Sequence, residues 1–331
     1  MSAAAIALTI GDPNGIGPEI AIKAAAQMAR EAGPSIVLVG DEFVIRFYAE
    51  QYAKDFAVEP FGGVALRRDA LYVLGVDALP RGAFCPGTPV AAGGRATVDY
   101  VSAAMRLVSE KHVSAIVACP HSETNVNAAG IPFTGYPGLL ARLSGIPEEN
   151  VFLMLVGGGL RIVHATLHER LQTALKRITP ELVERAARTA DSALRQLNVK
   201  QPRIGVFGIN PHAGEGGLFG DDDENITVPA VKRLQAAGLD VEGPVGADLM
   251  LGRRDCDAFV AMYHDQGHIP VKLMAGRNSA AMSIGAGVLF SSVGHGSAFD
   301  IAGRGLAEPD AVFRSLKLVS GATDLAELGA S

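Results

Sequence analysis

Apolar and polar positions alternate along this chain in two recurring patterns. Short apolar runs, such as Ala5 to Ile10 and the segment IVLVG that ends near Gly40, have the length and composition of buried strands. Longer segments repeat apolar residues at helical spacing, and after Pro18 the residues Ile20, Ala24 and Met28 recur every fourth position. Strands alternating with helices predict an α/β fold with a mostly parallel sheet.

The same two patterns continue through the chain. Helical spacing recurs between Gly94 and His112, from about Pro180 to Leu197 and from Ile226 to Ala237. The run VSAIVAC, which ends at Cys119, reads as a buried strand. A chain of 331 residues has room for two domains or one large α/β unit. Because no proline- or serine-rich linker marks a boundary, we expect two domains to share the sheet or to exchange segments.

Composition narrows the class of protein. Hydrophobic residues make up 48% of the chain, and the net charge is −6 with both signs interspersed. Nucleic acid is therefore an unexpected partner. The first apolar run lacks a basic leader and no segment reaches transmembrane length, so we expect a soluble cytoplasmic protein. The three cysteines lie far apart, which argues against a disulfide framework, and Cys119 is expected to be a buried free thiol.

Three histidines carry the candidate chemistry. His168, His212 and His264 each follow a strand-like run, in RIVHATLH, RIGVFGINPH and DAFVAMYH. Ligands of α/β proteins bind outside the carboxyl ends of the strands, where three imidazoles could converge on one metal ion. A single histidine after a strand is more often structural. The shared placement of all three favours a metal-dependent enzyme.

Several polar residues near these histidines are candidates for supporting roles. Asp248 and Asp265 could orient the imidazoles, although Asp248 suits a helix cap better. Lys272 could move protons beside a cation, or be an exposed lysine at the end of a strand.

His264 and His268 have the spacing of a metal-binding helix face. Gly267 and Pro270 make a regular helix there improbable, so we expect His268 to contact substrate or to lie in a solvated loop.

Two glycine-rich loops and one run of acidic residues are the remaining candidate sites. GDPNGIGPE (Gly11 to Glu19) joins a strand to a helix and could bind an anion, but neither it nor GEGGLFG (Gly214 to Gly220) is a GxGxxG turn. Each alone suits a tight turn, which argues against an ordinary Rossmann dehydrogenase. The acidic run Asp221 to Glu224 is expected to be a solvated helix start.

The segment SSVGHGSAFDIAGRG (Ser291 to Gly305) resembles the cofactor-adenosine loop of the isopropylmalate and isocitrate dehydrogenase superfamily, which binds NAD without GxGxxG. The resemblance implies two α/β domains that share a largely parallel or mixed sheet, with the active site in the cleft between them. The domains would span about 1–125 with 285–331, and about 126–284. The cofactor contacts that it implies are Gly11, Asp12, Asn14, His295, Gly296, Ser297, Ala298 and Asp300.

Six ordered segments resemble the 4-hydroxythreonine-4-phosphate dehydrogenase family nearly end to end: TIGDPNGIGPEI, AGIPFTG, GINPHAGEGG, GPVGAD, AMYHDQG and HGSAFDIAGRG. The resemblance implies that His168, His212 and His264 bind a divalent metal, with Asp248, Asp265 and Lys272 in the active site. Zinc suits three neutral nitrogens, and manganese, cobalt, nickel or iron would also fit. The family implies a homodimer with the metal at the subunit interface. Its reaction is NAD-dependent oxidation of an alcohol β to a carboxylate, followed by loss of carbon dioxide.

The chain departs from the family where the phosphate of the substrate is held. Tyr136 and Pro137 stand in place of His-Thr, and the lysine of the family's Pro-x-His-Lys motif is missing from CPHSETNV. Ala280 or Ala281 replaces an asparagine, and Phe290 replaces an arginine. Since a phosphomonoester needs several donors or cations, a less polar substrate is expected.

The segments that differ resemble the terephthalate dihydrodiol dehydrogenase branch of the family. That branch implies oxidation of a carboxylated cyclohexadiene diol to protocatechuate and carbon dioxide. The expected substrate contacts are His121, Ser122, Tyr136, His268, Arg277 and Asn278. The alternatives are a dehydrogenase of 4-hydroxythreonine-4-phosphate or of a related phosphorylated hydroxy acid, and a catalytically silent binding protein on the same scaffold.

Overall fold

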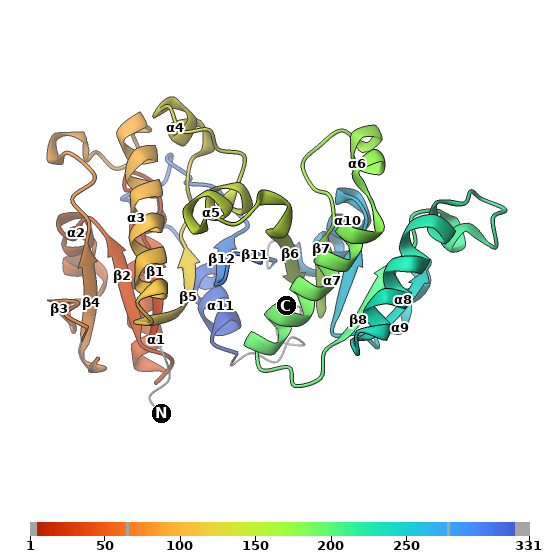
Figure 1. Cartoon of the computed structure of the whole chain (residues 1–331). Helices are drawn as coiled ribbons and strands as arrows, with labels where there is room; N and C mark the ends of the chain where they lie inside the picture. The colour runs from red at the N-terminus through yellow and green to blue at the C-terminus, as the bar shows by residue number, and fades with distance from the viewer. Residues whose placement is uncertain (1–4, 64–65, 277–278, 322–331) are drawn as a thin grey trace. The chain divides into compact units, whose positions relative to one another are not determined.

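The expected alternation of strands and helices is present in the computed structural model, which describes residues 5–63, 66–276 and 279–321 (Figure 1). The chain divides into two units. One runs from the amino terminus to Ser144 and resumes at Val288; the other runs from Gly145 to Gly287. No described helix is both long and apolar enough to cross a membrane.

The first unit is built on a parallel sheet with the strand order β3-β4-β2-β1-β5-β12. Its strands are β1 (Ala5–Thr9), β2 (Ile36–Gly40), β3 (Ala57–Pro60), β4 (Ala70–Gly75), β5 (Val113–Ala118) and β12 (Leu289–Val293). Every residue of β1 is buried, as expected for a central parallel strand covered on both faces.

Helices of the first unit pack on this sheet. α1 contacts α2 and α11, and α3 packs on β1, β2 and β5. Their bounds are α1 (Gly17–Arg30), α2 (Glu42–Tyr52), α3 (Ala91–Ser109), α4 (Glu123–Ala128), α5 (Tyr136–Ser144) and α11 (Asp310–Val319). Pro18 lies in the first turn of α1, where its missing N–H breaks no helical hydrogen bond.

The second unit has a mixed sheet with the order β11-β6-β7-β10-β8-β9, in which β6 runs antiparallel to both of its neighbours. Its strands are β6 (Phe152–Gly157), β7 (Leu160–His164), β8 (Arg203–Phe207), β9 (Asp240–Val245), β10 (Ala258–Ala261) and β11 (Ala280–Ile284). Its helices are α6 (Leu171–Arg177), α7 (Pro180–Gln196), α8 (Val228–Ala236), α9 (Ala247–Arg253) and α10 (His264–Ala275). An α/β fold with mixed pairing is therefore confirmed.

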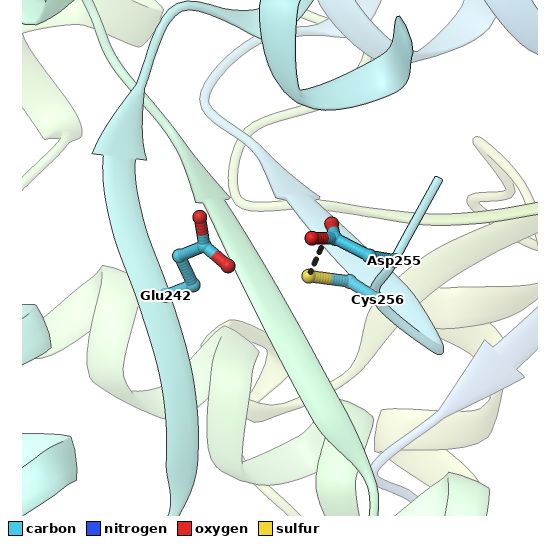
Figure 2. A group of neighbouring side chains, drawn as sticks. All are labelled: Glu242, Asp255 and Cys256. Atoms are coloured by element: carbon cyan, nitrogen blue, oxygen red, sulfur yellow. Dashed lines mark hydrogen bonds between the residues drawn. The ribbon is translucent and has the colours of Figure 1, made fainter. Parts of the chain in front are cut away.

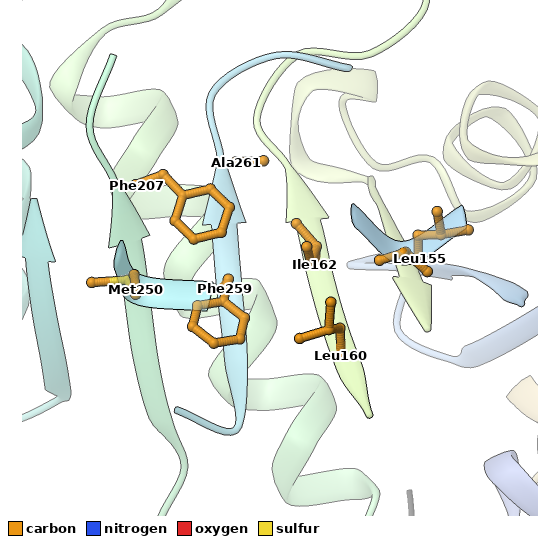
Figure 3. Close-up of a cluster of buried hydrophobic side chains, with 8 residues drawn as sticks. Leu155, Leu160, Ile162, Phe207, Met250, Phe259 and Ala261 are labelled. Carbon is orange, nitrogen blue, oxygen red and sulfur yellow. The ribbon is translucent and has the colours of Figure 1, made fainter. Parts of the chain in front are cut away.

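A hydrophobic cluster fixes α9 and α10 to this sheet (Figure 3). Phe207 of β8 and Phe259 of β10 stack with ring centroids 5.5 Å apart. Met250 of α9 and Val271 of α10 belong to the same buried group. Burying one such side chain stabilises the fold by about 1.5–3 kcal/mol, so this packing holds the start of α10 at the end of β10.

The expectation that no regular helix follows His264 was wrong. α10 includes both Gly267 and Pro270. A Cβ atom on Gly267 would lie 2.4 Å from His164 Nε2 and 2.8 Å from Ile162 Cγ2, so glycine lets the helix approach β7 closely. Pro270 removes one helical hydrogen bond, and the close packing of α10 on the sheet outweighs that loss.

Candidate metal and substrate site

The three candidate ligands follow three neighbouring strands of the second unit. β10 lies between β7 and β8 and is parallel to both. His168 comes four residues after β7, His212 follows β8, and His264 begins α10 directly after β10. Because the carboxyl ends of parallel strands lie at one edge of a sheet, all three histidines are at the same edge.

Within one chain, two of these histidines are close together. The rings of His168 and His264 have centroids 5.4 Å apart. The ring of His212 packs edge-on against Phe219, with centroids 5.9 Å apart. The three do not form a group whose ligand atoms all lie within 4.8 Å of one another in the part of the chain that the structure describes.

Carboxylates orient the imidazoles of His264 and His212. Asp265 Oδ1 lies 2.6 Å from His264 Nδ1, and Glu215 Oε2 lies 2.9 Å from His212 Nδ1. A carboxylate that accepts from Nδ1–H leaves Nε2 with a free lone pair, the arrangement found behind many metal-binding histidines. Glu215 was not among the residues predicted from the sequence, although a carboxylate three residues after a candidate ligand is visible there. Asp248 is exposed in the first turn of α9, and no hydrogen bond joins it to a histidine among the described residues.

The loop that carries His212 has an unusual backbone. His212 (φ 54°), Ala213 (φ 54°) and Glu215 (φ 44°) all adopt left-handed conformations. Such positions each cost on the order of 1–3 kcal/mol for residues other than glycine and cluster at functional sites. The surrounding structure must therefore hold this loop in place.

Asp223 supplies that support, and the expectation of a solvated acidic run was wrong at this residue. Its carboxylate is fully buried and accepts hydrogen bonds from the backbone N–H groups of Ile209 (2.8 Å) and Asn210 (2.9 Å). The hydroxyl of Thr227 donates a third at 2.6 Å. Asp223 thus fixes the start of the loop that places His212.

A fourth histidine, His164, lies behind the candidate ligands. It is the last residue of β7, and only 2% of it is exposed. Its Nε2 lies 2.9 Å from Nδ1 of His268, and the ring of His268 stacks on that of His264 with centroids 3.8 Å apart. Burial lowers the pKa of His164 to about 3. Burial, and then the neighbouring imidazoles of His264 and His168, lower the pKa of His268 to about 4.

Lys272 projects from α10 rather than from the end of a strand. Its Nζ donates a hydrogen bond to Ser279 Oγ at 2.8 Å. Arg277 and Asn278, which were expected to contact substrate, lie outside the described residues.

Aromatic rings gather in the first unit where the chain departs from the phosphate-binding pattern. Tyr136, at the start of α5, contacts His121 and Phe290, each with ring centroids 4.6 Å apart. Phe133 packs against His121 at 4.9 Å. We call these four residues the aromatic cluster. Ser122, an expected substrate contact, caps α4 by accepting from Asn125 N–H at 3.2 Å.

Two polar atoms of the aromatic cluster are buried without a hydrogen-bond partner among the described residues, Tyr136 Oη and His121 Nε2. Burial lowers the pKa of His121 to about 4 and raises the pKa of the Tyr136 hydroxyl. Both groups are therefore neutral near pH 7. Buried polar atoms without partners are costly, and they often mark the place of a ligand.

The loop after β1 is held mainly by its own polar side chains. Asp12 is buried and accepts from Asn125 Nδ2 (2.9 Å) and from the Asn14 N–H (3.0 Å), and burial raises its pKa. Asn14 Nδ2 donates to the carbonyls of Ala83 and Thr88. Gly11 has φ +69°, and a Cβ there would lie 2.2 Å from Pro120 O. Cofactor contacts from these residues remain predictions.

This loop packs directly on the second expected cofactor loop. The Ile16 N–H donates to Ser297 O at 2.9 Å, and a Cβ on Gly15 would lie 2.7 Å from Ser297 Cβ. Ser297 Oγ is buried without a partner in the described part of the unit, and Ala298 has φ 40°. His295, Gly296 and Asp300 are exposed. The first unit thus brings both expected cofactor segments together.

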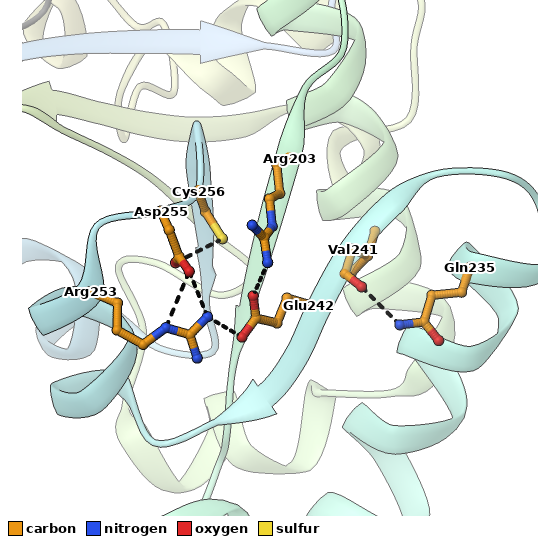
Figure 4. Close-up of polar contacts among 7 residues, drawn as sticks. All are labelled: Arg203, Gln235, Val241, Glu242, Arg253, Asp255 and Cys256. Atoms are coloured by element: carbon orange, nitrogen blue, oxygen red, sulfur yellow. Dashed lines mark hydrogen bonds and ion pairs between the residues drawn. The ribbon is translucent and has the colours of Figure 1, made fainter.

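Glu242, Asp255 and Cys256 form another group with metal-ligating atoms (Figure 2). Two arginines already neutralise it (Figure 4): Glu242 accepts from Arg203 at 2.5 Å and also from Arg253, which pairs with Asp255 at 2.7 Å. Burial, and then Asp255, raise the pKa of Cys256 to about 11, so the thiol stays protonated. The group is an ion-pair network near the amino ends of β8 and β10, opposite the histidines.

Comparison with known proteins identifies the family. The model of the family described as pyridoxal phosphate biosynthetic protein PdxA matches residues 32–319, and the chain belongs to this family. It is 46% identical to a 1,2-dihydroxy-3,5-cyclohexadiene-1,4-dicarboxylate dehydrogenase from Comamonas sp, over 95% of this chain and 96% of that protein. It is 37% identical to a D-threonate 4-phosphate dehydrogenase from Cupriavidus necator, over 94% and 95%.

Solved structures give the same family. A terephthalate 1,2-cis-dihydrodiol dehydrogenase from Burkholderia xenovorans LB400 is 56% identical with a TM-score of 0.79, covering 96% of this chain and 98% of that one. A 4-hydroxythreonine-4-phosphate dehydrogenase from Burkholderia phymatum is 34% identical with a TM-score of 0.86, covering 97% and 99%. These relatives are dehydrogenases, which supports an oxidoreductase that acts on a CH–OH group.

Proposed function

We propose that this chain is an NAD- and divalent-metal-dependent dehydrogenase that oxidises and decarboxylates a β-hydroxy acid. Its proposed substrate is the terephthalate cis-dihydrodiol, and its products are protocatechuate and carbon dioxide. The observation that supports this substrate is the neutral aromatic cluster, because it contains Tyr136 and Phe290, the residues that replace the family's phosphate-binding side chains.

The chemistry of the cluster favours a carbon ring over a phosphate. A phosphomonoester carries close to two negative charges and binds where several donors or cations converge. The cluster offers aromatic faces and two neutral polar atoms, Tyr136 Oη and His121 Nε2. Such an uncharged, apolar environment suits a cyclohexadiene ring, and a substrate group that reaches the buried Tyr136 Oη and His121 Nε2 would give both atoms a partner.

The histidines of the second unit suit a divalent metal. His212 and His264 have their Nδ1 atoms engaged by carboxylates, which leaves Nε2 available as a ligand, and His168 lies beside His264. When bound, the metal acts as a Lewis acid that lowers the pKa of the substrate alcohol. Three neutral nitrogens suit zinc, and manganese, cobalt, nickel or iron would also fit. Since His212 is not grouped with the other two, we propose a homodimer in which both chains contribute ligands.

The remaining proposed roles belong to Lys272 and to the two cofactor loops. Lys272, held by Ser279, would take up the proton of the substrate hydroxyl, with Asp265 keeping His264 oriented. NAD, when bound, supplies the hydride acceptor. The two loops that meet at Ser297 would hold it, and the exposed His295 would lie against the adenine, as the family resemblance implies.

A parallel assay of two substrates tests this proposal. Purified, zinc-loaded protein is offered the terephthalate dihydrodiol or 4-hydroxythreonine-4-phosphate with NAD or NADP, and NADH or NADPH formation is followed by absorbance. Protocatechuate is measured by chromatography. We expect turnover of the diol alone. Turnover of the phosphate ester alone would reject the substrate and favour the chemistry of the relatives named for phosphorylated hydroxy acids. Turnover of neither, with no cofactor bound, would favour a silent binding protein.

A further inference from the structure

Behind His264, two histidines form a hydrogen-bonded pair that joins α10 to the sheet. His164 Nε2 lies 2.9 Å from His268 Nδ1, and His164 Nδ1 lies 3.2 Å from the carbonyl oxygen of Leu153 in β6. Gly267 makes room for this pair, because a side chain there would collide with His164 Nε2. The pair is therefore part of the packing between α10, β7 and β6.

The backbone carbonyl determines where the protons of the pair lie. A carbonyl oxygen only accepts, so His164 Nδ1 must carry a hydrogen. In the neutral ring, His164 Nε2 is then an acceptor and His268 Nδ1 is the donor. Neutral His268 consequently has no hydrogen on Nε2. If His164 were protonated, it would donate to His268 instead of accepting from it. That would place a cation on a side chain that is 2% exposed and whose partners are a carbonyl and an imidazole, which is costly.

The orientation of the rings argues against His264 and His268 binding the same metal ion. The rings of His264 and His268 are stacked, with planes only 14° apart and centroids 3.8 Å apart. A metal ion binds in the plane of an imidazole, at about 2.0–2.1 Å from its nitrogen. Two nearly parallel planes at this separation do not converge on one ion. If His264 binds metal, the free lone pair of His268 is left for hydrogen bonding.

We propose that the His164–His268 pair is a positioning and specificity device: it fixes His268 with hydrogen on Nδ1, so that Nε2 accepts a hydrogen bond from a hydroxyl of the bound diol beside His264. The inference rests on the proposed function and adds the substrate group that His268 recognises. A neutral acceptor attracts an O–H group and repels the lone pairs of a carboxylate or phosphate oxygen. The pair therefore selects for a hydroxyl at this point of the substrate and against an anionic oxygen.

The position of the proton is tested first, without substrate. Nuclear magnetic resonance of full-length protein containing nitrogen-labelled histidine distinguishes protonated from bare ring nitrogens. We expect His268 to carry hydrogen on Nδ1 and none on Nε2, and we expect this preference to be lost in His164→Leu. Hydrogen on His268 Nε2 in the unsubstituted protein, or a charged His268 at neutral pH, would overturn the inference whatever the substrate proves to be. His268→Asn identifies the signals.

Kinetics with the dihydrodiol then test the role of the lone pair. His268→Asn retains a group near Nδ1 but lacks the Nε2 acceptor, and we expect KM to rise about tenfold with a smaller change in kcat, as for the loss of one hydrogen bond. His164→Leu should have a similar effect, and His164→Gln, whose amide oxygen can accept from His268, should restore most of it. An unchanged KM in His268→Asn would contradict the inference. If no diol is turned over, the proposed function fails separately, and the resonance result alone decides the proton position.

Discussion

The ring of Tyr136 lies against that of Phe290, with centroids 4.6 Å apart and planes inclined by 51°. Tyr136 begins α5 and precedes the second unit in the sequence, whereas Phe290 lies in β12 and follows that unit. The family resemblance implies a polar or charged residue at each of these two positions. Their contact shows that two departures, separate along the chain, belong to one buried cluster, so the chemistry of that cluster changes as a whole.

Tyr136→Phe should separate substrate binding from stability. The substitution keeps the ring but removes a buried hydroxyl that has no partner among the described residues. We expect the protein to become more stable, by about 1–3 kcal/mol, because an unsatisfied buried group is lost. We also expect KM for the diol to rise several-fold because the hydroxyl no longer meets the substrate. Thermal unfolding and steady-state kinetics measure the two effects.

Tyr48→Phe is the matched control, since Tyr48 Oη is also buried without a partner in the described residues and lies in α2, outside the cluster. It should stabilise the protein without changing KM. Equal KM values in both variants and the unsubstituted protein would rule out a substrate contact by Tyr136.

Asp265→Ala and Glu215→Ala should weaken metal binding. Each removes the carboxylate that holds the Nδ1–H of a proposed ligand, His264 or His212. Loss of such a partner typically reduces metal affinity about 10–100-fold. Titration with zinc, followed by calorimetry, measures the change. Glu181→Ala removes an exposed carboxylate that pairs with Arg233 and serves as the control. Unaltered zinc affinity in both variants would argue against these histidines as ligands.

Asp223→Ala should destabilise the second unit. It removes the acceptor of two part-buried backbone N–H groups and one buried hydroxyl. Hydrogen bonds to a charged group contribute about 1.5–3 kcal/mol each, and those left unsatisfied are costly. Denaturant unfolding gives the loss of stability. Asp222→Ala, at an exposed neighbouring carboxylate bonded to Asn210, should have a much smaller effect. Similar losses in the two variants would show that the Asp223 contacts are not decisive.

Gly267→Ala should disrupt the approach of α10 to β7. Its Cβ would lie 2.4 Å from His164 Nε2, and relieving such overpacking costs about 1–3 kcal/mol. A Cβ on Gly252 in α9 would meet no atom within 4 Å, so Gly252→Ala should instead stabilise its helix by about 0.5–1 kcal/mol. Thermal unfolding of the two alanine variants should therefore shift in opposite directions. A shift of Gly267→Ala toward higher temperature would mean that the helix can move away freely.

Acid should destabilise the fold through its buried histidines. Burial lowers the pKa of His121 to about 4 from the usual 6.5, so the unfolded chain binds more protons between these values. Stability therefore falls as the pH decreases from 6.5 towards 4, by at most about 1.4 kcal/mol per pH unit for one such group. His121→Phe should make unfolding free energy less dependent on pH in this window. An identical pH dependence would show that His121 binds protons equally in the folded and the unfolded chain, so that burial does not lower its pKa.

The local features of this protein could be predicted from its sequence alone. Apolar spacing located α1, α3, α7 and α8, and the helix expected from about Pro180 does begin at Pro180. The placement of His168, His212 and His264 after strand-like runs was also visible, because a short run of apolar residues by itself indicates a buried strand. The six ordered sequence motifs were enough to identify the family.

Which distant residues meet could be seen only in the folded chain. The fold places β10 between β7 and β8, which brings His264 beside His168. It also pairs His164 with His268 of α10, a helix that was not expected because it contains Gly267 and Pro270. It also buried Asp223 in an acidic run that looked solvated. Propensity and periodicity describe a residue's neighbours along the chain, whereas strand order, close helix packing and buried hydrogen bonds depend on contacts made between segments far apart in sequence.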